Sequence, residues 1–218
     1  MPEVKDRDIV IPGQLLGDSL KHDTNCFTEN GKVYSLVRGM ARLTDNKIDV
    51  IPLSGPYMPK VGDVVVGRIT EDFGGIYLVD LNSAYFCILR EKNDRNMRKT
   101  INYAIGELIS GKIVHVDEVH ESDLDGIFKL NGGLIIKVDP KRIPRVIGKN
   151  RSMVNMIREK TGCNLVVGQN GLVWVKGPKA DTAIRAIKKV EAEAHTTGLT
   201  ERITQMLTIQ SSSKEGVI

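Results

Sequence analysis

Five basic residues lie close to one glycine in the last third of the chain, an arrangement suited to holding phosphate groups. The binding candidates in this segment are Lys141, Arg142, Arg145, Gly148, Lys149, Asn150 and Arg151. Between residues 140 and 190 the chain has twelve lysines and arginines and two acidic residues, a net charge of +10, although the whole chain carries only +4. One strongly basic segment in a nearly balanced chain is typical of a nucleic-acid binder. We therefore predict contacts with RNA phosphates; an exposed helix face without a ligand is the alternative.

A second group of positive charges lies in a polar stretch just before residue 100. Arg95, Arg98 and Lys99 are mixed there with acidic residues such as Glu91 and Asp94. A segment this polar is expected to form an exposed loop, because it has little to bury. Its basic residues are further candidates for guiding RNA, and a loop without a ligand explains them equally well.

The sequence shows no catalytic or metal-binding pattern. The histidines His22, His115, His120 and His195 lack the spacing of a shared metal site. An acidic run over residues 117–125 could suggest a divalent ion, but a polar hairpin loop explains it better. There is no phosphate-binding Gly-x-x-x-x-Gly-Lys-Ser/Thr loop and no Ser/His/Asp arrangement. We expect no enzymatic activity, no metal and no cofactor.

The amino-acid composition limits the classes of protein to which the chain can belong. The N-terminus is too polar for a signal peptide, and no apolar run approaches the length of a membrane span, so we expect no membrane partner. Cys26, Cys87 and Cys163 lie far apart among apolar residues, which favours buried thiols in a reducing cytoplasm. Aromatic residues make up only 5% of the chain, so phosphate contacts should outweigh base stacking. Such binding depends steeply on salt and tolerates many RNA sequences.

The pattern of strands and turns predicts a mixed, multidomain fold with domains at residues 1–57, 58–131 and 132–218. In the first, short strands flank Asn30-Gly31 and residues 45–47, which predicts hairpins of a small all-β domain. The second has five strand candidates and a long polar connection after the third, as in a five-stranded OB-type β-barrel. The candidates span residues 64–70, 76–81, 85–89, 112–116 and 126–130.

The third segment combines helices and strands and is expected to form an α/β domain. Strands are predicted at residues 134–138, 165–167 and 172–175, and helices at 140–147, 152–161 and after Pro178. Gly148 begins the turn between the first two helices, and Gly162 should end the second. Leu199, Ile203 and Leu207 could add a separate amphipathic turn or two, and the chain should fray from Ser211 onward.

This order of elements resembles a KH domain. In that family a Gly-x-x-Gly loop between two helices clamps the backbone of about four nucleotides. Here Gly148, Lys149 and Asn150 match the loop, whereas Arg151 replaces the second glycine. The resemblance implies RNA binding at this turn, with Arg151 as a substitute phosphate contact.

The second segment resembles the OB-fold repeat named for ribosomal protein S-one, through residues 61–69 and 79–81. The aromatic residues usual on its second strand and the histidine usual after its third are missing. Taken in order, all three segments resemble the RNA-binding cap subunits of the archaeal exosome. The matching stretches are residues 10–13, 50–53, 57–63, 143–148 and 167–171.

That resemblance implies a non-catalytic subunit, three copies of which cap a hexameric ring of phosphorolytic 3′–5′ exoribonuclease subunits. The N-terminal domain would dock on the ring, and the other two would bind single-stranded RNA and guide it into the central pore for degradation and processing. In this family the Gly-x-Asn-Gly element, here Gly168, Gln169, Asn170 and Gly171, joins the KH domain rigidly to the barrel and does not contact RNA.

Two other classes stay open. A relative of the phosphorolytic ribonucleases would have its KH domain before the OB repeat, and this chain has the reverse order. The alternative is an RNA-binding transcription or translation factor built from OB and KH modules. Such transcription factors carry two KH units after the barrel, and one is recognisable here.

Overall fold

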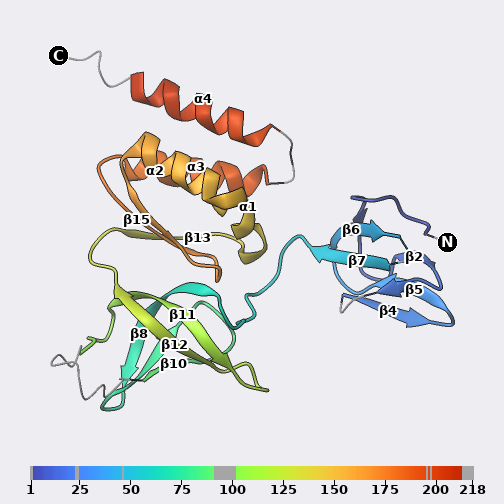
Figure 1. The fold of residues 1–218 in the computed structure, drawn as a ribbon, viewed down its shortest axis with the longest axis horizontal. Helices are drawn as coiled ribbons and strands as arrows, with labels where there is room; N and C mark the ends of the chain where they lie inside the picture. The colour runs from blue at the N-terminus through green and yellow to red at the C-terminus, as the bar shows by residue number, and fades with distance from the viewer. Residues whose placement is uncertain are drawn as a thin grey trace. The chain divides into compact units, whose positions relative to one another are not determined.

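The computed structural model of the chain describes residues 2–22, 25–45, 47–90, 102–194, 196 and 198–212. The chain forms two compact units that divide after Gly55. The first unit is all-β, and the second joins a closed five-stranded barrel to an α/β region (Figure 1). The predicted fold class, mixed and multidomain, is confirmed.

The first unit consists of two small sheets with strand orders β1-β6-β7-β3 and β2-β5-β4. Its strands are β1 (Ile9–Val10), β2 (Leu15–Asp18), β3 (Lys21–His22), β4 (Cys26–Glu29), β5 (Lys32–Ser35), β6 (Gly39–Thr44) and β7 (Lys47–Pro52). Both expected hairpins are present, and Asn30 (φ 50°) and Gly31 (φ 77°) give the first its left-handed turn. We did not predict β2 and β3.

The barrel closes in the order β10-β12-β11-β8-β9, with β10 and β12 parallel and the other pairs antiparallel. Its strands are β8 (Val64–Asp72), β9 (Ile76–Asp80), β10 (Cys87–Arg90), β11 (Leu108–Val116) and β12 (Ser122–Lys129). Strands β11 and β12 each begin four residues before the predicted start, because Ser110, Gly111 and Ser122 are buried there and hid the apolar pattern. Gly67 lies inside the first strand, where a Cβ atom would come within 2.5 Å of the Val79 side chain.

The α/β region has a three-stranded sheet in the order β13-β15-β14, as expected of a KH domain. Its elements are β13 (Leu134–Lys137), the 3₁₀ helix η1 (Pro140–Arg142), α1 (Ile143–Ile147), the 3₁₀ turn η2 (Lys149–Arg151), α2 (Ser152–Thr161), β14 (Asn164–Val167), β15 (Leu172–Lys176), α3 (Ala180–Ala192) and α4 (Leu199–Ser212). The helix expected over residues 140–147 is split in two, because Pro144 lacks the N–H that would bond to the carbonyl of residue 140 in a continuous helix. Gly162 ends α2 in a left-handed conformation, as predicted (φ 66°).

Helix α4 is longer than the sequence suggested. It has 14 residues, and Leu199, Ile203 and Leu207 are buried against the helices of the KH region. Tertiary packing therefore extends a segment whose own pattern was weak. Among the helices the structure describes, none is long and apolar enough to cross a membrane.

The strand β15 joins the barrel and the α/β region through a shared core. Its Val173 and Val175 side chains belong to the cluster under the helices, whereas Leu172 and Trp174 pack with Val66 of the barrel. Figure 1 shows the helices on one side of this sheet and the barrel on the other. Both faces of β15 are thus covered, which explains its uninterrupted apolar run.

Candidate nucleic-acid interface

The turn after α1 has backbone conformations that suit glycine. Gly148 has φ 74° and ψ 170°, a combination essentially confined to glycine. A Cβ atom there would lie 2.8 Å from the Met153 backbone nitrogen at the start of α2. Asn150 (φ 52°) and Arg151 (φ 61°) are both left-handed. Arg151 therefore occupies the fourth position of the turn in a conformation that costs an arginine about 1–2 kcal/mol.

The turn presents its basic side chains to solvent. Lys141, Arg145, Lys149 and Arg151 are all exposed, as is Asn150 between the last two. Within the described residues, the side chains of these four cations form no hydrogen bond or ion pair with the rest of the protein. Their charges are not neutralised internally and are available to phosphate oxygens.

Arg142 is placed differently from its neighbours. Its Nη1 atom donates to the Glu191 carbonyl at 2.6 Å, and the Glu191 carboxylate accepts from the Asp139 N–H at 2.8 Å. Arg142 thus ties η1 to the end of α3, and a contact between this residue and RNA stays a prediction. No local pattern distinguished it from the other basic residues, since its partner lies 49 positions away.

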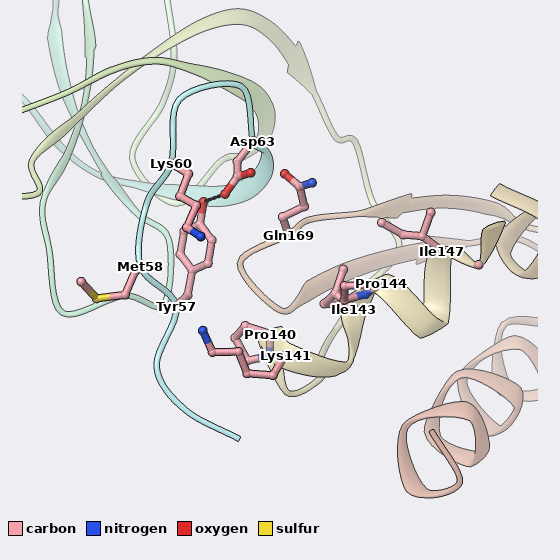
Figure 2. Close-up of a pocket in the computed structure, with 11 residues that line it drawn as sticks. Tyr57, Met58, Lys60, Asp63, Pro140, Lys141, Ile143, Pro144, Ile147 and Gln169 are labelled. Atoms are coloured by element: carbon pink, nitrogen blue, oxygen red, sulfur yellow. Dashed lines mark hydrogen bonds between the residues drawn. The ribbon is translucent and has the colours of Figure 1, made fainter. Parts of the chain in front are cut away.

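A pocket of about 400 Å³ adjoins the turn. One wall is the segment before β8, with Tyr57, Lys60 and Asp63; the other is formed by η1, α1 and the turn before β15, with Lys141 and Gln169 (Figure 2). The sequence did not predict this pocket, because residues 57–63 carry no local pattern of a ligand site. Only tertiary structure brings residues so far apart in sequence to one place.

The first wall is fixed by a hydrogen bond from the Tyr57 hydroxyl to Asp63 Oδ2 at 2.8 Å. Burial, helped by the neighbouring Asp63 carboxylate, raises the pKa of Tyr57. The hydroxyl therefore stays protonated at physiological pH and keeps donating. On the opposite wall, Gln169 Oε1 accepts from the Val64 N–H at 3.1 Å.

The turn over residues 168–171 connects the two parts of the second unit by hydrogen bonds. The Asn170 side chain is fully buried: its amide donates to the carbonyls of Val66 and Leu81, both at 2.7 Å, and its oxygen accepts from the Val66 N–H at 3.2 Å. The Gln169 N–H donates to the Val64 carbonyl at 2.8 Å. A Cβ atom on Gly168 would lie 2.8 Å from the Val66 nitrogen, so only glycine allows this approach.

Comparison with known proteins agrees with this geometry. A family described as "KH domain" matches residues 133–181, and one described as "Exosome RNA binding protein RRP4 N-terminal domain" matches residues 7–54. The Exosome complex component Rrp4 of Methanobrevibacter smithii is 41% identical, over 94% of this chain and 72% of its own. That of Methanothermus fervidus is 38% identical, over 94% and 96%. The chain belongs to the Rrp4 family.

A solved structure supports the assignment to the Rrp4 family. A crystal structure described as an exosome complex RNA-binding protein is 30% identical, with a TM-score of 0.61, and matches 73% of this chain and 99% of its own.

The aromatic side chains of this Rrp4-family barrel divide between core and surface. Tyr77 is buried and packs edge-on against Tyr103, and Tyr85 packs against the ring of His120. Phe86 is 61% exposed. Of these three aromatic side chains, only Phe86 presents most of its ring to solvent. Phe73 and Phe128 are also exposed.

The remaining candidates from the sequence are the loop cations and the acidic run. Arg95, Arg98 and Lys99 lie outside the described residues. The acidic run forms the turn between β11 and β12, where Asp117 Oδ1 accepts from the N–H groups of Val119 and Glu121. Within the part of the chain that the structure describes, no group of three His, Cys, Asp or Glu side chains could hold a metal ion.

Proposed function

We propose that this chain is a non-catalytic RNA-binding component of an exosome, holding single-stranded RNA for a nuclease that other subunits supply. The observation that carries the proposal is the turn at Gly148, which presents four cations without internal partners among the described residues. The names of its relatives, exosome complex components, support the same assignment. The alternative, a transcription or translation factor built from the same modules, has no comparable support.

The proposal extends to the assembly. Three copies would cap a hexameric ring of 3′–5′ exoribonuclease subunits in the cytoplasm and guide RNA into its central pore for degradation and processing. Domain 1–57 would dock on the ring, while domains 58–131 and 132–218 would bind RNA. The turn over residues 168–171 would serve to keep these two RNA-binding domains in register. Arg95, Arg98 and Lys99 would line the RNA path beside the barrel.

Binding at the turn is expected to recognise the phosphate backbone rather than the bases. Exposed cations contact phosphates in any sequence, and each neutralised phosphate of a single strand contributes about 0.7 to the slope of log affinity against log salt. A component that serves a general degradation machine needs this tolerance of sequence.

Charge reversal at the turn tests RNA binding. The variant Lys149→Glu/Arg151→Glu should bind fluorescent single-stranded RNA at least tenfold more weakly at low salt and with a shallower salt slope. Arg185→Glu is the control, because Arg185 is exposed on α3 and is not part of the turn. Equal affinity of the double variant and the control would show that the turn is not the contact surface.

Incubation of the purified chain with RNA, phosphate and magnesium tests whether the chain lacks catalytic activity. The RNA should stay intact until a ring of nuclease subunits is added. Degradation that co-purifies with the chain and persists after contaminants are removed would refute the non-catalytic assignment. Co-purification from native extract with RNA polymerase or ribosomes, in place of ring nucleases, would favour the alternative factor.

A further inference from the structure

The pocket beside the turn has the size and chemistry of a ligand site. Its volume of about 400 Å³ falls in the range of roughly 300–1,000 Å³ that is usual for small-molecule pockets. Its lining combines apolar surface from Met58, Pro144 and Ile147 with a few polar groups. Such a combination suits a flat, partly apolar group that also carries hydrogen-bonding atoms.

The polar groups of the pocket come from both walls. Lys60 and Lys141 are exposed ammonium groups on opposite sides, and Figure 2 shows Lys141 extending toward the Tyr57 wall. Asp63 uses one carboxylate oxygen for Tyr57, and Gln169 uses its carbonyl oxygen for Val64. Among the described residues, the other Asp63 oxygen and the Gln169 amino group have no partner. One donor and one acceptor thus remain for a ligand.

We propose that this pocket holds one nucleotide of the bound RNA strand, with its phosphate between Lys60 and Lys141, its base against Pro144 and Ile147, and the edge of the base toward Asp63 and Gln169. The inference rests on the proposed RNA-binding function and places a specific subsite within it. A negatively charged group is favoured beside the lysines and disfavoured beside the carboxylate, which sets the orientation. Every base carries both donors and acceptors on its edge, so no preference for one base follows.

The continuity of the pocket with the turn favours an RNA strand over other occupants. Gly148 belongs to the turn and also lines the pocket. The backbone of an RNA strand bound to Lys149 and Arg151 can therefore continue into the pocket along α1, which has no acidic residue. The barrel wall gives the RNA a path from the KH domain toward the OB fold through a site that both domains build.

Affinity measurements test the phosphate part of the proposal. The variant Lys60→Met/Lys141→Met removes both charges and keeps most of the length of each side chain. We expect it to bind a fluorescent octauridylate and a matched octaadenylate several-fold more weakly, with a salt slope lower by about 0.7, the value for one lost phosphate contact. Arg185→Met should change neither quantity, because that exposed arginine lies on α3.

Cross-linking tests whether a base of the RNA lies in the pocket. A single 4-thiouridine is moved along the octauridylate, and the cross-linked peptides of the full chain are identified by mass spectrometry. One position should cross-link to residues 57–63 and also to residues 140–148.

The outcomes separate this inference from the proposed function. If RNA binds and Lys149→Glu/Arg151→Glu weakens it, while the pocket variant binds normally and neither wall cross-links, the pocket proposal is overturned and the function stands. If the chain binds no RNA, both fall. If nuclease ring subunits protect Lys60 and Lys141 from acetylation and RNA does not, the pocket holds a protein segment and the nucleotide is ruled out.

Discussion

Replacing Asn170 by aspartate should uncouple the KH domain from the barrel while leaving the shape of the side chain unchanged. The amide of Asn170 donates to two carbonyls, those of Val66 and Leu81, at 2.7 Å each. In Asn170→Asp an oxygen takes the place of this NH₂ group and faces two oxygens. Because the residue is fully buried, water cannot replace either lost donor.

The size of the effect follows from the two carbonyls. Each buried acceptor left without a partner costs about 1–3 kcal/mol, so the free energy of unfolding should fall by about 2–6 kcal/mol, out of a total of roughly 5–15 kcal/mol for a domain. A buried carboxylate adds a charge that desolvation disfavours. Protonation relieves this charge and restores one donor, so the deficit should be smallest in acid and should grow as the pH rises above about 4.

The single tryptophan provides the assay. Trp174 is the only one in the chain and belongs to the cluster between sheet and barrel, so its fluorescence in a urea titration reports on this contact. In Asn170→Asp the fluorescence of Trp174 should change at a lower urea concentration than the far-ultraviolet circular dichroism of the helices. In the unaltered chain the two transitions should coincide. Asn155→Asp, on an exposed position of α2, is the control. A difference of less than about 0.5 kcal/mol between the variants, the usual scale of surface substitutions, would refute the reasoning.

Three further predictions follow from local geometry. Arg42 at 2.9 Å, assisted by Lys47 at 3.3 Å, lowers the pKa of Asp49. The folded state therefore loses this stabilisation as the pH falls below about 3.8, and hydrogen exchange of the β6–β7 amides, corrected for intrinsic rates, should accelerate there. The variant Asp49→Asn should remove this pH dependence. Arg151→Gly should leave the melting temperature unchanged or slightly higher, because the strain relieved, about 1–2 kcal/mol, offsets the entropy cost of glycine, about 0.5–1 kcal/mol. Its RNA affinity should nevertheless fall, and full affinity would show that the arginine contacts no phosphate. Gly168→Ala places a methyl group 2.2 Å from Asn170 Oδ1 and should lower the unfolding midpoint in urea, with a cost of about 1–3 kcal/mol; a wild-type midpoint would contradict the close approach of this turn to β8.

The features that sequence patterns predicted are those that local chemistry determines. The Asn30-Gly31 turn, the stop at Gly162 and the order of KH elements each follow from a few adjacent residues. The features that were missed depend on distant partners. The α4 helix needs the core beneath it, Arg142 bonds across 49 positions, and residues 57–63 become a pocket wall only when α1 lies opposite.

The same turn that joins the domains also shapes the proposed nucleotide site, so stability and binding are physically linked. Asn170 anchors to the barrel, and its neighbour Gln169 donates through its backbone to Val64, accepts through its side chain from the same residue, and lines the pocket. A displacement of this turn would move one wall relative to Lys60 and Asp63. Exposed cations recognise phosphates in any RNA sequence. Because base contacts add little to this binding, its strength depends on cations held at a fixed spacing. Rigid coupling of barrel and KH domain supplies that spacing, because it holds Lys60 and Lys141 on opposite walls without a direct contact between them.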